Sequence, residues 1–261
     1  MHENQSNHSL VQHLRSLQTP QGRSRTGLYL IEGVRHLARA VEERAPIQSL
    51  FLSPCDLSNP FGQKLARKLK KSGTPCTQLS PKLYRDLTLA AEPQGLGATV
   101  RQQWQSLSNV RPTKDGLWLA LESIESAGNL GTMIRTAEAI GVNGIIVIYG
   151  NADPYEPKAV RASMGSLFSQ CLIRCSATEF IAWARAFNIS LIGSSPAGLL
   201  NCKALKYRRP AVLLIGSEKQ GLSQHLLDAS DFTVRIPMSG RADSINAAVA
   251  TGILLYQLNN P

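Results

Sequence analysis

The chain has 261 residues, a formal net charge of +10 and 43% hydrophobic residues, so it can bury a sizeable core in one large domain or in two ordinary ones. Its longest apolar runs are far shorter than the roughly 20 residues that a membrane-spanning helix needs, so we expect no membrane partner. The polar start, residues 1–25, lacks a hydrophobic signal-peptide core. We expect a frayed terminal segment on a cytoplasmic protein.

The cysteines predict no special chemistry. Five are present, without a C-x-x-C pair, at positions 55, 76, 171, 175 and 202. Cys171 and Cys175 lack a second cluster of metal ligands. We therefore expect free thiols in a reducing compartment and no metal site.

Positive charge is concentrated in the first part of the chain. Residues 1–112 hold 15 Lys and Arg against 7 Asp and Glu, whereas residues 113–261 hold 13 against 11. The densest basic run is 64–71. Such an excess suits contact with a polyanion, but a solvated helix face and a need for solubility explain it equally well.

Residues 26–103 alternate apolar runs with amphipathic segments. The pattern predicts strands at 27–31, 47–52 and 77–79, and helices at 34–44 and 61–71. We interpret this part as a small α/β domain. The next segment, 104–114, is polar and aperiodic and predicts a linker.

Residues 115–261 continue with buried runs separated by helical patterns. Strands are predicted at 117–121, 144–148, 190–192, 211–215 and 232–236. Apolar residues at helical spacing predict helices around 130–137 and 180–187. This order is typical of an α/β fold with a mostly parallel sheet and helices on both faces. The carboxyl ends of its strands would share one edge, where ligands bind.

Three polar segments follow three of these strands. In the first, Asn129 lies where a helix should begin, and Arg135 lies on its second turn. An ordinary N-cap and an ordinary surface arginine would explain them. Gly128 and Gly131 flank Asn129 and would let a ligand approach closely. The segment is not G-x-G-x-x-G, and no acidic residue follows about 20 positions later, which disfavours a nicotinamide enzyme.

The second and third segments are similarly ambiguous when each is taken alone. Gly216 ends a strand, and Glu218 lies in the turn that follows. In the third segment, 236–246, Ser244 and Asn246 precede a helix of small apolar residues. A capped core helix explains the alanines of that helix but not the asparagine.

Together, in this order and at these spacings, the three segments resemble the signature motifs of the SpoU (TrmH) family of RNA ribose methyltransferases, in the SPOUT superfamily. The resemblance covers about 117–258 and includes the segment 158–165 between the first two motifs. The segment 29–35 is similar to the ribosomal-protein-like RNA-binding domain that many members carry.

The resemblance implies methylation of a ribose 2′-hydroxyl in structured RNA with S-adenosylmethionine. The two-unit layout with a basic N-terminal part favours ribosomal RNA over transfer RNA as the target. It also implies a homodimer formed through a domain with a deep trefoil knot. The implied polar site consists of Asn129, Arg135, Glu218, Ser244 and Asn246. Implied cofactor contacts are Gly216, Ile236, Met238 and Ile245. Implied RNA contacts are Arg135, Lys158, Arg161, Ser163, Glu32 and Arg35.

Methyl transfer from a sulfonium is an in-line displacement that needs no metal, so alignment is the main task of the protein. A guanidinium with a pKa above about 12 is a poor base. We therefore expect Arg135 to grip a phosphate, to orient the 2′-hydroxyl and to stabilise developing negative charge. In the family this arginine often serves the cofactor site of the partner subunit.

Two departures from the family pattern bear on packing and target choice. Residue 247 is alanine instead of valine, and the first motif opens with Glu122–Glu125 instead of aspartate-proline. Three alternatives stay open: a non-catalytic RNA-binding member of the fold, a methyltransferase acting on a base nitrogen, and a Rossmann-type methyltransferase. The intact polar residues argue against the first, the Ser-Ile-Asn sequence at 244–246 against the second, and the order of the motifs against the third.

Overall fold

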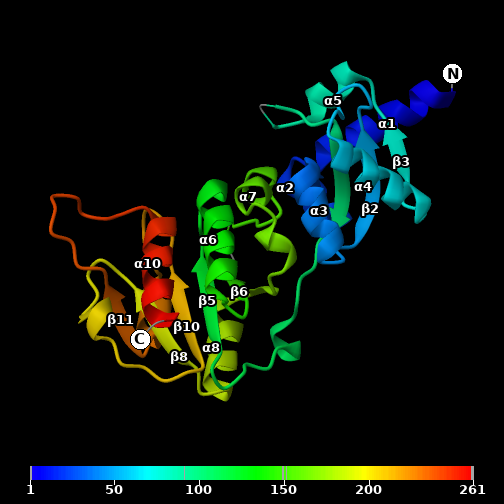
Figure 1. Cartoon of the computed structure of the whole chain (residues 1–261). Coiled ribbons are helices and arrows are strands. Elements are labelled where there is room, and N and C mark those ends of the chain that lie inside the picture. Colours follow the sequence, from blue (N-terminus) through cyan, green and yellow to red (C-terminus); the bar gives the residue numbers. More distant parts are fainter. Residues whose placement is uncertain (1, 91, 149, 151, 260–261) are drawn as a thin grey trace. The chain divides into compact units, whose positions relative to one another are not determined.

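The computed structural model describes residues 2–90, 92–148, 150 and 152–259 (Figure 1). The chain forms two compact units. The first comprises Met1–Gln102 and Asp153–Phe168, and the second comprises Gln103–Ala152 and Ser169–Pro261. The segment 153–168 therefore packs with the N-terminal residues, although the sequence pattern had placed it inside a continuous domain over 115–261.

The first unit contains a four-stranded sheet in the order β1-β4-β2-β3. Its strands are β1 (Leu28–Glu32), β2 (Ile47–Leu52), β3 (Cys76–Gln78) and β4 (Leu96–Arg101). The pair β2–β3 is parallel, and β4 is antiparallel to both β1 and β2. Its helices after β1 are α3 (Val34–Glu42), α4 (Pro60–Lys71), α5 (Pro81–Leu87) and α7 (Pro157–Ala162). Asn59 and Ser80 cap α4 and α5, each followed by proline at the first helical position.

The N-terminal segment differs from the expected polar tail. It forms α1 (His2–Ser16) and α2 (Pro20–Thr26). Val11, Leu14 and Leu17 are buried in one cluster with residues of β1, β2 and α5. One apolar residue every three positions is enough to anchor these turns, because burial of each side chain stabilises by roughly 1.5–3 kcal/mol.

A buried ion pair holds the segment 153–168 in the first unit. Arg23 of α2 is 1% exposed, and its Nε donates to Asp153 Oδ2 at 2.8 Å. Its Nη1 donates to the Leu17 carbonyl at 3.0 Å. The rings of Tyr29 and Tyr155 pack 4.6 Å apart beside it. The carboxylate and the guanidinium are 130 residues apart in the chain.

The second unit contains a seven-stranded sheet in the order β7-β6-β5-β10-β8-β11-β9, in which every strand pair is parallel. Its strands are β5 (Leu117–Glu122), β6 (Ile145–Ile148), β7 (Leu172–Cys175), β8 (Ser190–Ser194), β9 (Leu200–Asn201), β10 (Ala211–Ile215) and β11 (Phe232–Arg235). Its helices are α6 (Ala127–Ile140), α8 (Ala177–Ala186), α9 (Gln224–Ala229) and α10 (Ala247–Asn259). Short 3-10 turns lie at Leu107–Asn109 and Cys202–Ala204 in this unit, and at Ser166–Phe168 in the first unit.

Helices cover both faces of this sheet (Figure 1). On one face, Trp118 and Leu214 pack with Phe180 of α8 and Leu226 of α9. On the other, α6 and α10 pack against each other and α10 contacts β10. The α/β class, the parallel sheet and the preceding small α/β domain are therefore confirmed.

The predicted linker 104–114 lies against the second unit. Gln105 forms a parallel bridge with Ile173, and Arg174 stacks on the Trp104 ring at 4.1 Å. Trp183 donates to the Val110 carbonyl at 3.3 Å.

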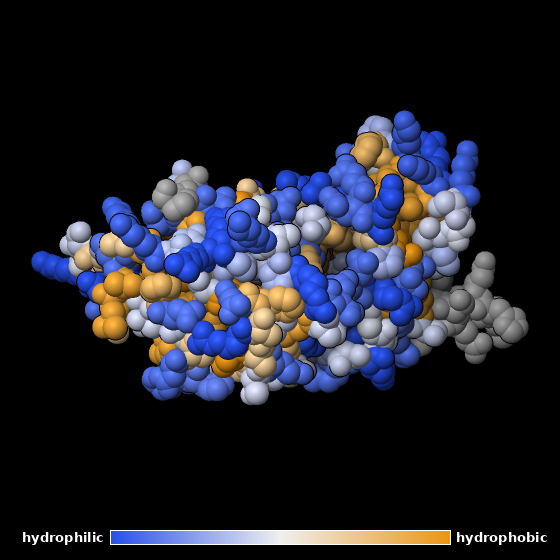
Figure 2. Space-filling model, turned by 90° about the horizontal axis from the view of Figure 1, so that it is seen from below, coloured by the Kyte–Doolittle hydropathy of each residue, from blue (hydrophilic) through white to orange (hydrophobic). Residues whose placement is uncertain are grey.

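Hydrophilic side chains cover most of the face in Figure 2, with hydrophobic ones in smaller patches. None of the helices in the described part of the chain is both long and apolar enough to cross a membrane.

Candidate active site

The three polar segments meet at the edge where the parallel strands end. Glu122 is the last residue of β5, Gly216 follows β10 and Ile236 follows β11. The Glu122 carboxylate joins the end of β5 to the start of α9, because it accepts a hydrogen bond from the Ser223 amide at 2.7 Å. The carboxyl edge of the sheet is where α/β folds bind ligands.

Glu218 is the centre of a hydrogen-bonded clamp at this edge. Its carboxylate accepts from the backbone amides of Glu125 and Ser126, at 2.9 and 3.1 Å. It also accepts from Asn129 Nδ2 at 2.8 Å. The turn after β10 is thereby fixed to the amino end of α6, where the free amides and the helix dipole favour a negative charge.

The clamp continues to the third segment. Asn246 Nδ2 donates to Asn129 Oδ1 at 3.0 Å, and Asn246 Oδ1 accepts from the Ala248 amide at 2.8 Å. A carboxylate only accepts hydrogen bonds, so the Asn129 amide group must face Glu218 and its oxygen must face Asn246. One chain of polar groups, Glu218–Asn129–Asn246, therefore connects three segments that lie far apart in the sequence.

The clamp keeps Glu218 ionised. Burial by itself would raise the pKa of Glu218, but the hydrogen bonds from the Glu125 amide, the Asn129 side chain and the Ser126 amide outweigh it and lower the pKa. At neutral pH this group is a fixed carboxylate that accepts hydrogen bonds and is unsuited to deliver a proton.

Two details of the helix starts differ from expectation. Asn129 is not the N-cap of α6, since the helix begins at Ala127 and Ser126 Oγ accepts from the Asn129 amide at 3.3 Å. A serine just before the first helical residue is the signal that would have found this cap. Asn246 caps α10, whereas Ser244 lies exposed in the preceding loop and has no hydrogen-bond partner among the described residues.

The turn at Gly216 has no room for a side chain. The backbone closes through reciprocal hydrogen bonds between Ser217 and Gly221, both at 3.0 Å. A Cβ on Gly216 would lie 2.0 Å from the Gly221 carbonyl carbon. Glycine at this position therefore lets the strand end and the returning turn approach each other closely.

The loop 236–246 offers the groups that a nucleoside-containing cofactor needs. Within the described part of the chain, the backbone N–H groups from Met238 to Ile245 make no hydrogen bonds. Met238 and Ile245 are apolar and exposed. Figure 1 shows this loop, in orange to red, leading from β11 to the start of α10. Free backbone donors and acceptors beside apolar side chains suit an adenosine group.

Arg135 lies outside the hydrogen-bonded clamp. It is exposed on α6 and makes no hydrogen bond or ion pair within the described ranges. It follows Asn129 by six residues, which places it about 9 Å along the helix and about 120° around it. The structure therefore does not bring Arg135 and Asn129 to the same face of α6.

The residues implied in RNA contact all lie in the first unit, apart from Arg135. Arg35, Lys158 and Arg161 are exposed, and Glu32 is half-buried. Ser163 is fully buried, and its hydroxyl donates to the Val160 carbonyl at 2.7 Å. A direct RNA contact by Ser163 is therefore contradicted, because its side chain is used inside the fold.

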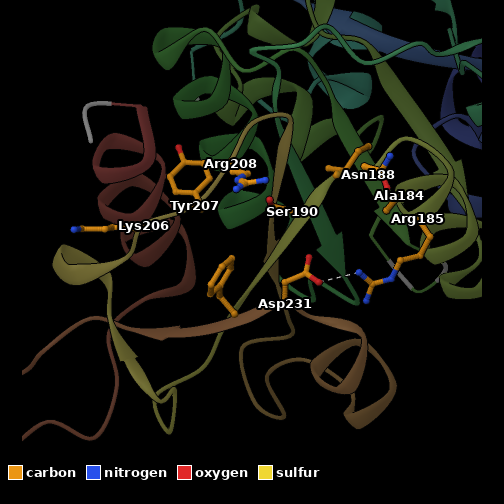
Figure 3. A pocket seen from close by; sticks show the side chains of 10 residues that line it. Ala184, Arg185, Asn188, Ser190, Lys206, Tyr207, Arg208 and Asp231 are labelled. Carbon is orange, nitrogen blue, oxygen red and sulfur yellow. Dashed lines mark hydrogen bonds and ion pairs between the residues drawn. The ribbon is translucent and has the colours of Figure 1, made fainter.

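The large hollow in Figure 3, of about 620 Å³, lies at the opposite edge of the second sheet. Ser190 and Phe232, where β8 and β11 begin, line it together with Tyr207 and Arg208. Its Arg185–Asp231 ion pair, at 2.8 Å, is drawn dashed. Because the three polar segments follow the carboxyl ends of the strands, and this hollow lies at their amino ends, it is not the candidate site.

No group of three His, Cys, Asp or Glu side chains in the described ranges could hold a metal ion.

Comparisons with known proteins agree with this geometry. The profile of the SpoU rRNA Methylase family matches residues 116–256, and that of the MRM3-like substrate binding domain matches residues 8–98. A 23S rRNA (uridine(2479)-2′-O)-methyltransferase of Streptomyces viridochromogenes is 34% identical over 242 residues, covering 90% of this chain and 83% of the relative. The 23S rRNA (guanosine(2553)-2′-O)-methyltransferase RlmP of Bacillus subtilis is 26% identical, covering 95% of each chain.

A solved structure extends the likeness to three dimensions. The SpoU methyltransferase AviRb of Streptomyces viridochromogenes, in complex with the cofactor AdoMet, superposes with a TM-score of 0.89 at 32% identity and covers 96% of each chain. The family profile spans the parallel-sheet unit that carries the Glu218–Asn129–Asn246 clamp. This chain belongs to the SpoU rRNA methylase family.

Proposed function

We propose that this protein methylates a ribose 2′-hydroxyl of ribosomal RNA, with the Glu218–Asn129–Asn246 clamp as the frame of its active site. S-adenosylmethionine supplies the methyl group. The observation that carries the proposal is the clamp itself, because Glu218 and Asn246, 89 and 117 residues away from Asn129 in the chain, both bond Asn129 at 2.8–3.0 Å on the ligand edge of the sheet. Family membership supports assigning the methyl transfer to that edge.

The cofactor is held by backbone more than by charge. Gly216 lets the turn after β10 close tightly against the end of that strand. The loop from Ile236 to Ile245 contributes its free backbone groups to the adenosine, and Met238 and Ile245 cover it with apolar surface. Hydrogen bonds from a preformed backbone cost little entropy on binding.

Arg135 and Ser244 contact the RNA substrate. Both are exposed and without partners among the residues described, so they are available to RNA. Arg135 grips the phosphate next to the target ribose and orients the 2′-hydroxyl, and Ser244 completes the hydrogen-bond set. The Arg135 guanidinium also stabilises the negative charge that develops on the attacking oxygen.

The working unit is a homodimer formed through α10 and the loop before it. Val249, Ile253 and Tyr256 are 54%, 41% and 66% exposed, and their spacing of four and three residues places them on one stripe of α10. Arg135 points away from the Asn129 face of its own α6. In a dimer it would reach the RNA substrate at the active site of the partner subunit.

The C-terminal part of the second unit forms the trefoil knot of the superfamily. The segment after β11 runs through the loop 236–246 into α10, which packs on α6 and β10. Because knots are almost absent from other folds, this point rests on family membership. A cytoplasmic location follows from the ribosomal substrate.

The decisive experiment maps 2′-O-methyl groups in total RNA from cells with and without the gene. We expect one ribosomal site to be lost, and to return with the wild-type gene but not with Arg135→Ala. Arg208→Ala is the matched control, since it removes another exposed arginine of the same unit at the opposite edge of the sheet. Loss of a transfer RNA site instead would establish the tRNA alternative.

Calorimetry with purified protein separates the enzyme from a non-catalytic RNA-binding member. We expect S-adenosylmethionine to bind to both the wild type and Arg135→Ala. No heat of binding to the wild type would mean that the fold is retained without the reaction. Tyr256→Asp should shift the protein from dimer to monomer in light scattering, whereas Leu199→Asp, at an exposed leucine outside α10, should not.

A further inference from the structure

The first unit contains a pocket of about 250 Å³ that the methyl-transfer site does not use. Three segments form most of its wall: the end of β1 with the start of α3, residues Tyr84 to Ala90 with Glu92 and Gln94, and helix α7 with Met164. Gln18 also lines it. All of its lining residues belong to the first unit. The volume is slightly below the range of about 300–1,000 Å³ typical of sites for drug-sized ligands, so it suits one flat heterocycle.

A half-buried carboxylate lies in this pocket. Glu32 accepts a hydrogen bond from the Thr88 hydroxyl at 2.6 Å. Burial raises the pKa of Glu32, and the Thr88 hydrogen bond, the nearby Leu89 and Ala90 amides and the charge of Arg161 offset this only in part. A carboxylate has about four lone-pair sites, and among the described residues Thr88 alone donates to it with full hydrogen-bond geometry, so Glu32 can accept two further donors.

Other wall groups suit a nucleotide. Leu30, Pro157 and Met164 provide apolar surface, and Leu89 is 47% exposed at the rim. Arg161 donates to the Leu89 carbonyl and brings positive charge to the same rim.

Two polar groups of α3 are also available. Arg35 is exposed and has no hydrogen-bond partner among the described residues. His36 lines the pocket as well; its Nδ1 bonds the Glu32 carbonyl at 3.1 Å, while its buried Nε2 has no partner in the described structure. The pocket thus combines apolar walls, an acceptor and nearby cations.

We propose that this pocket holds an unstacked guanine base of the substrate RNA, with the Glu32 carboxylate accepting hydrogen bonds from the N1–H and N2–H groups of that base. Proteins recognise RNA sequence mainly through unstacked bases whose Watson–Crick edges they can reach. Guanine presents two adjacent N–H donors, which match the two oxygens of a carboxylate, whereas uracil presents one N–H between two acceptors. Arg35 and Arg161 would neutralise the flanking phosphates. The inference rests on the proposed RNA substrate.

The test is an NMR titration of the full-length protein with guanosine, inosine and uridine 5′-monophosphates. S-adenosylhomocysteine is present in excess, so that the cofactor site is filled and cannot bind the purine. We expect guanosine monophosphate to bind about tenfold more tightly than inosine monophosphate, which lacks only the 2-amino group, and more tightly still than uridine monophosphate.

Two variants separate base recognition from loop anchoring. Glu32→Gln keeps the shape but replaces one acceptor by a donor, so it should lose the preference for guanosine over inosine monophosphate. Thr88→Val removes the hydrogen bond that holds Glu32 while leaving the carboxylate, so it should keep the preference. Both variants should bind S-adenosylmethionine as the wild type does.

Equal binding of the three nucleotides, no detectable binding of guanosine monophosphate, or an unchanged preference in Glu32→Gln would overturn the inference. Methylation of total RNA is measured on the same wild-type sample. Normal methylation without nucleotide discrimination would reject the guanine pocket alone. Discrimination without methylation would reject the proposed enzyme activity and leave the pocket standing.

Discussion

Glu218 and Glu32 lie in two regions of the molecule that shift the pKa of a glutamate in opposite directions. Around Glu218, at the edge of the second sheet, three donors come from the amino end of α6 and lower the pKa of the carboxyl group. Around Glu32, in the pocket of the first unit, burial dominates and raises the pKa. The hydrogen bonds of the Glu218 clamp are therefore complete in the folded chain, whereas the Glu32 carboxylate can still accept hydrogen bonds from a ligand.

The two regions also differ in how they are held together. The clamp is made of hydrogen bonds between loops that each follow a buried strand. The first-unit pocket depends on the segment 153–168, which the Arg23–Asp153 ion pair holds in place. Changes at these supports should therefore have different consequences for cofactor binding and for RNA binding.

The largest effect is expected for Asp153→Ala. It would leave the Arg23 guanidinium buried at 1% exposure without its counter-charge, which costs about 3–5 kcal/mol of the free energy of unfolding. Denaturant unfolding followed by circular dichroism measures the loss. Asp86→Ala, at an exposed aspartate with no ion pair among the described residues, serves as the control and should stay within about 0.5 kcal/mol. A small effect of Asp153→Ala would mean that the segment 153–168 is held by other contacts.

Gly216→Ala should damage the second region selectively. The new Cβ would lie 2.0 Å from the Gly221 carbonyl carbon, so the turn must open. We expect the affinity for S-adenosylmethionine to fall at least about tenfold, equivalent to about 1.4 kcal/mol. Gly252→Ala on α10, whose Cβ would meet only a methyl group at 3.6 Å, should bind as the wild type does. Equal affinities for all three proteins would contradict a cofactor site at Gly216.

Glu218→Ala should have a moderate effect on stability. It removes the acceptor of three hydrogen bonds, and because the group is exposed to solvent we expect a cost of about 1–2 kcal/mol. Thermal unfolding measures it. Lys219→Ala tests the neighbouring position, where only a surface ion pair with Glu125 is lost, and should lower the unfolding temperature less than Glu218→Ala does.

The smallest effects, and the sharpest comparison, lie in the pH dependence of stability. The lowered pKa of Glu218 stabilises the fold above the unfolded value of about 4.3, and this stability is lost as the pH falls through the folded value. The raised pKa of Glu32 has the opposite sign, since stability is lost as the pH rises from about 4.3 through its folded value.

Unfolding curves between pH 3 and 7 for Glu218→Gln and Glu32→Gln test these signs. The difference in free energy of unfolding between Glu218→Gln and the wild type should be more unfavourable at pH 7 than at pH 3. For Glu32→Gln the same difference should be more favourable at pH 7 than at pH 3. Differences of the same sign for the two variants would refute the contrast between the regions.

Much of the fold could be predicted because its signals are local. The strand 211–215 was predicted with its observed bounds, since five consecutive apolar residues between polar turns leave little ambiguity. The sequence pattern did not predict the N-terminal helices α1 and α2 or the strands β4 and β7. In α1 the apolar residues are sparse, and only the surface of β1, β2 and α5 makes them a core.

The candidate site was predicted as a set of residues but not as a set of contacts. The motifs singled out Asn129, Glu218 and Asn246, and the structure joins them. The choice of Ser126 over Asn129 as the cap had a local signal that the motif reading passed over, whereas the burial of Ser163 had none. The burial of Ser163 depends on which segment lies nearby in space.

The sequence alone determined the α/β class, the order of buried strands and helices, and the three polar segments that identify the methyltransferase family, because hydrophobic periodicity and motif spacing are properties of neighbouring residues. Tertiary structure alone decided that Glu218, Asn129 and Asn246 share one hydrogen-bonded chain, that residues 153–168 join the first unit, and that Glu32 lies in a pocket. Those outcomes depend on distances between residues up to about 130 positions apart, which only the packed chain defines.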